Sequence, residues 1–300
     1  MDFPGVFGDH IMPDKIHQLN VSFLVDTLEK QRGGTAGNIA YNLALLKSSS
    51  SIFAAAGNDF NEYAIFLKQN GIDTSNIEII KDKPTASAFI MTDKNDNQIS
   101  AFYPGAMRET PSLSLKGIQT DFAIISPNDP KAMVKFAKEA TEKNIPYMMD
   151  PGMQLPVLNA SDLTDMVLGA HILIGNDYEI DLLKKKSSLS EKDLFEQKVE
   201  ILITTLGANG SQIKTKGETF AIKPAKPKEV VDPTGAGDAY RAGFMAGFLR
   251  GLDVKTCGQM GSVAASFAIE KYGTQQHHFT IQTFQDRYVQ AFGDMIELEK

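Results

Sequence analysis

Four short apolar segments in the middle of the chain constrain its fold more than any other feature. They are DFAIIS, IPYMMD, HILIGN and EILITT, which begin at residues 121, 145, 171 and 200. None of them alternates apolar with polar residues, which is typical of strands that are buried on both faces. Helical stretches such as KAMVKFAKEATEKN separate them. This alternation predicts a parallel sheet covered by helices on both sides.

Each of these predicted strands ends in a polar residue, namely Ser126, Asp150, Asn176 and Thr205. Ligands of open α/β sheets bind at the carboxyl ends of the strands. We therefore expect a ligand site along this edge.

The first third of the chain is less regular. The segment 33–47, GGTAGNIAYNLALLK, predicts a glycine turn and a helix with Ile39, Leu43 and Leu46 on one stripe. SIFAAAGND then predicts a strand, and NEYAIFLKQNG predicts a helix that ends at Gly71. TASAFIMTD and NQISAFY predict a β-hairpin that interrupts the alternation of strands and helices. Because we find no repeat or linker, we expect a single domain over residues 1–300.

Composition narrows the class of protein. A net charge of −7 gives no basic surface, so we expect neither nucleic acid nor a membrane as a partner. The single cysteine, Cys257, excludes an internal disulfide and favours a reducing compartment. No apolar run approaches the ~20 residues of a membrane span, and the N-terminus does not resemble a signal peptide. These features predict a cytoplasmic protein. The sequence leaves open whether it is a monomer or a homodimer.

The segment VVDPTGAGDAYRAGF, residues 230–244, joins a glycine-rich turn to a helix start. A Walker A loop would need a lysine in this turn, and a dinucleotide fingerprint would need glycine in place of Tyr240. What remains is the turn Gly235-Ala236-Gly237, with Asp238 in the first turn of the helix. Free N–H groups there predict an anion site, whereas an acid that only stabilises its own helix is the alternative. We expect a side chain at Gly237 to block the anion and to strain the backbone.

The string DPTGAGDAYRAGF resembles the C-terminal signature of the ribokinase-like (PfkB-type) carbohydrate and nucleoside kinases. The resemblance implies that Gly235, Ala236 and Gly237 form an anion hole for the transferred phosphoryl group. It also implies that Asp238 is the catalytic base. The N–H groups would then hold the phosphate, while the carboxylate takes a proton from the acceptor hydroxyl.

A second string, GGTAGNIAYNLALL, resembles the N-terminal glycine-rich motif of the same family. It implies that Gly33 and Gly34 form a hinge between lid and core, and that Asn38 binds substrate hydroxyls. The string NDYE resembles the family's N-x-x-E element, in which Asn176 and Glu179 would organise Mg²⁺ and phosphate.

A further string, TTLGANG, resembles the nucleotide loop of the family. It implies that Thr205, Gly207 and Gly210 lie near ATP. The residues by themselves also predict a turn between a strand and a hairpin, and both interpretations fit together.

The resemblance covers about residue 10 to the end and implies an α/β, ribokinase-like fold with three α/β/α layers and a mostly parallel central sheet. Parts of roughly 10–32 and 84–104 would form a small β lid over the substrate. The implied reaction is phosphoryl transfer from ATP with Mg²⁺, and it leaves a dependence on K⁺ open.

The strings LNVSF, FYPGAM and EKYGTQ look like the bacterial adenosine and nucleoside kinase branch of the family. They imply an enzyme that phosphorylates the 5′-hydroxyl of adenosine or a related nucleoside, as in purine salvage. Two alternatives stay open. One is a sugar kinase for ribose or fructose, and the other is a non-catalytic member that binds a nucleoside.

Members of this family usually open with a strand in the middle of the sheet, ending in an aspartate that holds substrate hydroxyls. This chain begins MDFPGVFGDHIMPDK, which resembles the stretch after that strand, so the role is not carried over to Asp2. We expect either that the natural protein starts upstream of Met1 or that another segment fills the position beside Ile52. An empty position would leave costly unpaired backbone groups.

Overall fold

The central element is a six-stranded sheet in the order β10-β9-β8-β7-β6-β5. The computed structural model describes residues 1–11, 17–18, 20–95 and 97–298. Strands β5 to β8 run parallel, and β9 and β10 continue the sheet in antiparallel fashion. The strands are β5 (Ala123–Ile125), β6 (Tyr147–Met149), β7 (Ile172–Asn176), β8 (Ile201–Thr205), β9 (Ser211–Lys214) and β10 (Thr219–Ile222). The four strands predicted from the apolar segments and their parallel arrangement are thus confirmed.

Both faces of this sheet are buried, because successive side chains of a strand point to opposite faces. Ile172 and Ile174 of β7 belong to one apolar core, whereas Leu173 between them belongs to the other. Ile201 and Leu202 of β8 divide between the two cores in the same way. This explains why the apolar segments show no alternation of polar residues.

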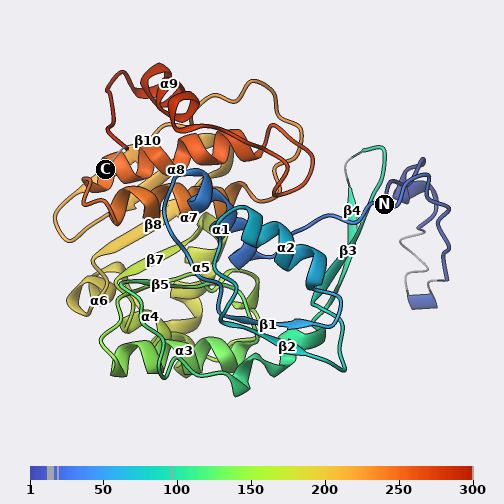
Figure 1. Ribbon diagram of the computed structural model, residues 1–300, viewed down its shortest axis with the longest axis horizontal. Helices are drawn as coiled ribbons and strands as arrows, with labels where there is room; N and C mark the ends of the chain where they lie inside the picture. The colour runs from blue at the N-terminus through green and yellow to red at the C-terminus, as the bar shows by residue number, and fades with distance from the viewer. Residues whose placement is uncertain (12–16, 19, 96, 299–300) are drawn as a thin grey trace.

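Helices cover both faces of the sheet and give three layers (Figure 1). One side carries α3 (Pro130–Glu142), α4 (Ala160–Leu168), α5 (Asp177–Ser187) and α6 (Glu191–Glu196). The other side carries α1 (Thr35–Leu45), α7 (Ala236–Phe248), α8 (Val254–Ala268) and α9 (Ile281–Phe292). The short 3₁₀ turns are η1 (Phe7–Asp9), η3 (Gly105–Ser112), η4 (Gly152–Gln154) and η5 (Gly207–Asn209). No helix among the described residues has both the length and the apolar character to cross a membrane.

Helices α7 and α8 pack unusually close, because small residues line their contact. A Cβ atom on Gly243 would lie 2.5 Å from the carbonyl oxygen of Met260. Next to this contact, the side chain of Cys257 is fully buried, and burial raises the pKa of its thiol to about 12. The small residues of α7 therefore allow its close approach to α8.

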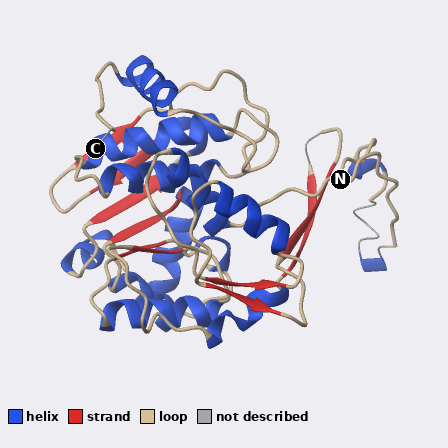
Figure 2. Ribbon diagram, viewed as in Figure 1, coloured by secondary structure: helices blue, strands red, loops and turns tan. Residues whose placement is uncertain are grey.

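Strands β1 (Ala54–Gly57) and β2 (Ile77–Ile80) form a separate parallel pair, joined through α2 (Asn61–Gln69). The predicted hairpin is also confirmed. Strands β3 (Ser87–Thr92) and β4 (Gln98–Tyr103) pair in antiparallel fashion and project from the body of the molecule (Figure 2). All six residues of β4 are exposed, so that both faces of the hairpin are open.

The first residues of the chain extend the far end of this hairpin. Thr92 N donates to Met1 O over 3.0 Å, and Phe3 N donates to Thr92 O over 2.8 Å. Lys94 N similarly donates to Gly5 O over 3.0 Å. Within the described residues, no strand pairs with both β5 and β1, and residues 1–11 do not enter the central sheet. On one side Ile52 N donates to Asp73 O over 3.0 Å, and on the other side none of the described segments forms a strand that joins it to the central sheet.

Candidate active site

The glycine-rich turn leads into α7 through a left-handed residue. Gly235 has φ +84°, and a Cβ atom there would lie 3.0 Å from Cγ2 of Thr274. Glycine is favoured at this position because other residues rarely adopt that conformation. Asp232 Oδ1 accepts from Thr234 N over 2.9 Å, and its Oδ2 accepts from Gly273 N over 3.0 Å. The turn is therefore bound to the segment that follows α8.

The structure corrects the prediction made for the backbone at Gly237. Gly237 lies inside α7 and its φ is outside the left-handed region, so the backbone strain predicted on adding a side chain there was wrong. A side chain would strain the backbone at Gly235 instead. A Cβ atom on Gly237 would lie 3.0 Å from Nη1 of Arg241, so a close contact disfavours a larger residue there.

Asp238 lies in the first turn of α7 and faces α1. Its Oδ2 accepts a hydrogen bond of 2.7 Å from Nδ2 of Asn38. Burial raises the pKa of the Asp238 carboxyl to about 6, although the Asn38 bond and the charge of Arg241 oppose this. A carboxyl with this pKa is ionised at neutral pH and still accepts a proton readily, as a general base should.

Arg241 lies one turn further along α7 and forms a buried pair with Asp150. Its Nε and Nη2 donate to the two carboxylate oxygens over 2.6 and 2.7 Å. Burial lowers the pKa of Arg241, but the charges of Asp150, Asp238 and Glu179 outweigh it and raise the pKa overall. The pair joins the carboxyl end of β6 to α7, and it brings a fixed positive charge close to Asp238.

The glycine pair before α1 is anchored from two sides. Gly34 has φ +90°, and its neighbour Gly33 accepts a 2.9 Å bond from the hydroxyl of Tyr63 through its carbonyl oxygen. Thr274 Oγ1 donates to Arg32 O over 3.0 Å. The predicted hinge thus lies directly beside the loop that contacts Gly235.

Asn176 and Glu179 meet at the start of α5. Glu179 N donates to Oδ1 of Asn176, and Asn176 N donates to Oε2 of Glu179, each over 2.8 Å. This capping box is the structural role that the four-residue string also allows. Asn176 is at the same time the register partner of Thr205 in β8.

The predicted nucleotide loop follows β8 directly. Leu206 N donates to Gly210 O over 2.8 Å, and Gly207 and Gly210 both have positive φ. A Cβ on Gly210 would lie 2.1 Å from the carbonyl oxygen of Ile222. The loop is therefore a tight turn between β8 and β9, as the residues predicted.

The structure brings Asn38, Asp238 and the Gly33–Gly34 turn into one hydrogen-bonded cluster. The negative charge of Glu179 raises the pKa of Arg241, and the charge of Arg241 in turn acts on Asp238. Thr205, Gly207 and Gly210 lie at the carboxyl end of β8, and within the described part of the chain none of them forms a hydrogen bond with Asp238. Sequence reasoning missed Arg241, Gln275 and Tyr63, whose partners are distant in the chain.

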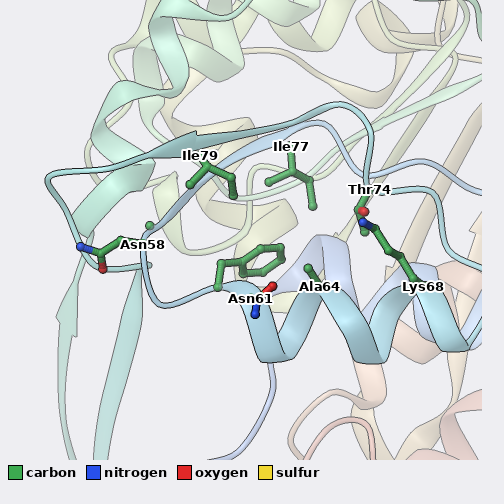
Figure 3. A pocket seen from close by; sticks show the side chains of 9 residues that line it. Asn58, Asn61, Ala64, Lys68, Thr74, Ile77 and Ile79 are labelled. Carbon is green, nitrogen blue, oxygen red and sulfur yellow. The ribbon is translucent and has the colours of Figure 1, made fainter.

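A separate hollow of about 300 Å³ lies between α2 and the β1–β2 pair (Figure 3). Its lining residues are Gly57, Asn58, Phe60, Asn61, Ala64, Lys68, Thr74, Ile77 and Ile79. This lining contains no carboxylate and none of the predicted site residues. It offers no base for a hydroxyl group.

A family model for the pfkB family of carbohydrate kinases matches residues 6–280. The chain belongs to the pfkB family. The match includes every predicted site residue, and the resemblance stated from the sequence is confirmed.

Two nucleoside kinases are similar to most of the chain. The nucleoside kinase of Methanothermobacter thermautotrophicus is 37% identical over 269 residues, which are 87% of this chain and 86% of that protein. The structure of Burkholderia thailandensis nucleoside kinase in complex with inosine superposes with a TM-score of 0.89 at 33% identity. It covers 98% of this chain and 95% of that one. A ribokinase-like α/β fold is thus confirmed.

Proposed function

We propose that this protein is an ATP-dependent nucleoside kinase that phosphorylates the 5′-hydroxyl of adenosine or a related purine nucleoside. The observation that carries the proposal is Asp238, a carboxyl with a pKa of about 6 in the first turn of α7, directly after a glycine turn. The nucleoside kinases to which the chain is similar support the substrate class. We further propose a cytoplasmic role in purine salvage.

The N-terminus of α7 provides the charge stabilisation. First-turn N–H groups of a helix have no partner within the helix and can hold an oxyanion. Ala236 N already donates to Pro233 O over 3.2 Å, so we assign the stronger donors of the anion hole to Gly235 and Gly237. The ionised Asp238 would take the proton of the attacking hydroxyl, which contributes roughly 10²–10⁴-fold to the rate.

Glu179 is the candidate for contact with Mg²⁺ bound to the nucleotide. No group of three or more His, Cys, Asp or Glu side chains that could hold a metal ion occurs among the described residues. Mg²⁺ on a nucleotide needs only one or two carboxylates besides phosphate oxygens and water. Glu179 fits this need, because the capping box with Asn176 fixes its position. The ion would neutralise charge on the β- and γ-phosphates.

The remaining predicted residues take the two substrates. Thr205, Gly207 and Gly210 would line the ATP site at the end of β8. Asn38 would hold a substrate hydroxyl together with the Gly33–Gly34 turn. Its amide uses one N–H for Asp238 and one lone pair for Gln275, which leaves one donor and one acceptor position for the substrate.

Residues 1–300 would act as one ribokinase-like domain with a lid. The lid comprises parts of roughly 10–32 and 84–104, of which residues 12–16, 19 and 96 lie outside the described residues. The projecting β3–β4 hairpin supports this assignment. We expect closure of the lid to exclude water from the reacting groups.

A kinase assay over adenosine, inosine, ribose and fructose with ATP tests the proposal. We expect higher kcat/KM values for the nucleosides than for the sugars, and activity that depends on added Mg²⁺. The matched variant Asp238→Asn should lose about 10²-fold or more in turnover while it still binds nucleoside.

Three other results would each contradict part of the proposal. A preference for ribose or fructose would make the protein a sugar kinase, an alternative that the similarity to the ribokinase of Bacillus subtilis at 25% identity supports. Binding of nucleoside without phosphorylation would indicate a non-catalytic member. Turnover of Asp238→Asn near the wild-type value would remove Asp238 from the reaction.

A further inference from the structure

Asn38, which donates to Asp238, is itself held by Gln275. The Gln275 side chain is only 3% exposed and belongs to the segment between α8 and α9. Its Nε2 donates to Asn38 Oδ1 over 2.8 Å and also to the hydroxyl oxygen of Tyr63. The Tyr63 hydroxyl donates in turn to the carbonyl oxygen of Gly33. An unbroken chain of hydrogen bonds thus runs from the carboxylate of Asp238 to the glycine hinge.

The direction of every bond in this chain is fixed by its two ends. An ionised carboxylate and a backbone carbonyl can only accept hydrogen bonds. Asn38 must therefore turn its NH₂ toward Asp238 and its oxygen toward Gln275. Tyr63 must donate to Gly33, so its oxygen is left to accept from Gln275. Between the oxygens of Asn38 and Tyr63, the hydrogen-bond chain therefore needs a group that donates to both. The Nε2 of Gln275, with its two N–H bonds, is that group.

We propose that Gln275 is a positioning residue for the carboxylate of Asp238 and connects it to the Gly33 hinge. The inference rests on the proposed function, in which Asp238 takes the proton of the substrate hydroxyl. By fixing the amide of Asn38, Gln275 keeps a donor, and never an acceptor, against the ionised carboxylate. Without it the Asn38 amide is free to rotate.

The first turn of α1 supports this role independently. A Cβ atom on Gly37 would lie 2.1 Å from the Tyr63 hydroxyl oxygen and 3.3 Å from Nε2 of Gln275. The Tyr63 hydroxyl and the Gln275 amide therefore lie against the backbone of Gly37, and they can do so because Gly37 has no side chain. Nδ2 of Asn42 also donates to the main-chain oxygen of Asn38 over 2.9 Å, which fixes the backbone that carries the Asn38 side chain.

The charged and titratable groups around Asp238 come from several elements. On its own helix Arg241 favours the ionised carboxylate, and Asp150 at the end of β6 opposes it. The others near this cluster are Glu179 of α5, Tyr63 of α2 and Arg32 before α1. None of these groups is changed when Gln275 is replaced by methionine, so a shift in the titration of Asp238 can be assigned to the hydrogen bonds.

The test is the pH dependence of kcat/KM for nucleoside phosphorylation in Gln275→Met. Methionine keeps the length of the side chain but has no N–H donor. We expect the acidic limb of the profile to move upward by about one pH unit, because the hydrogen bond to the charged carboxylate is weakened. The loss of activity should be largest near pH 6 and should fade at higher pH. Gln275→Glu replaces both donors with acceptors and adds a second acid, so its shift should be larger.

Two further variants serve as controls. Gln276→Met makes the same change one residue away, at an exposed side chain whose Nε2 donates to Oε1 of Gln31. It should leave activity and profile unchanged. Tyr63→Phe keeps the bond from Gln275 to Asn38 but releases Gly33. It should raise the KM for nucleoside and leave the acidic limb in place.

An acidic limb at the wild-type pH in both Gln275→Met and Gln275→Glu would overturn the inference, whatever activity remains, because Gln275 would then only fill space. Thermal unfolding of each variant shows whether the fold is retained. Failure of the proposed function is a separate result, since it would appear as normal turnover in Asp238→Asn.

Discussion

The carboxyl group of Asp238 ionises in a setting where burial opposes its charge. Its pKa of about 6 lies above the ordinary value of 3.8, mainly because of burial. Above pH 6 the folded state therefore bears a cost for holding the charge, and this cost disappears as the pH falls toward 4 and the group takes up a proton. The same property that makes Asp238 a good proton acceptor thus lowers stability at neutral pH.

We predict that Asp238→Asn is more stable than the wild type at pH 7.5, by about 1–3 kcal/mol, because the amide has no charge to bury. The difference should shrink toward zero near pH 4. Urea unfolding at the two pH values measures it. The exposed Asp181→Asn is the control and should give no gain. A variant that is less stable at pH 7.5 would show that the charge of Arg241 outweighs burial.

At Gly237 we predict that valine abolishes activity. The new side chain would meet Nη1 of Arg241, which holds Asp150, and would occupy the approach of the phosphoryl group. Steady-state kinetics should show a loss of at least about 100-fold. Gly217→Val, at a turn with no atom within 4 Å of the new Cβ, is the matched control. Normal activity of Gly237→Val would mean that the phosphates bind elsewhere.

Among the elements, α7 shows how close packing positions a site. Its glycine and alanine residues allow contact with α8 at backbone distance. We predict that Gly243→Ala lowers the free energy of unfolding by about 1–3 kcal/mol, because a Cβ there would overlap with Met260 O. Urea unfolding checks this, with Gly8→Ala as the control because its Cβ has no neighbour within 4 Å. An unchanged midpoint would show that α8 moves away at little cost.

Elements with a local pattern were predictable from the sequence, and contacts between distant elements were not. The apolar runs of β5 to β8 and the turn before α7 have signatures within a few residues. The pair of Arg241 and Asp150 joins residues 91 positions apart, and no spacing rule reveals it. Gln275 was equally hidden, since its polar partners lie in α1 and α2. The anion turn and base candidate were thus predicted, but not the side chains that orient them.

On the scale of the whole molecule, the β3–β4 hairpin projects from the body with exposed apolar side chains. Phe89 and Phe102 are 55% and 50% exposed, and the two strands pair with each other, while the first residues of the chain bond to Ile90 and Thr92. Apolar residues that are open on both faces of a hairpin are suited to cover a bound ligand. Asp2 bridges both Thr92 of β3 and Thr27 in the segment before α1. The proposed hinge at Gly33 and Gly34 lies at the end of that segment, where the Tyr63 hydroxyl donates to Gly33 O.

We predict that adenosine together with a non-hydrolysable ATP analogue slows amide hydrogen exchange in β3 and β4. Lid closure should protect these strands several-fold, while β6 and β7 in the buried sheet change little. Mass spectrometry of peptides from both regions gives the comparison. Equal exchange in the hairpin with and without ligands would contradict its assignment as the lid.

The reactivity of Cys257 can report how often the contact between α7 and α8 opens. It is the single cysteine of the chain, it lies buried beside the α7–α8 contact, and its thiol has a pKa of about 12. A thiol reagent in solution attacks the thiolate, so labelling has to wait until the two helices separate. The rate of modification by an aromatic disulfide reagent therefore counts these separations without any introduced probe. Slower labelling in the presence of nucleoside would then report, from a residue outside the hydrogen-bonded cluster, that ligand binding holds the helix carrying Asp238 in place.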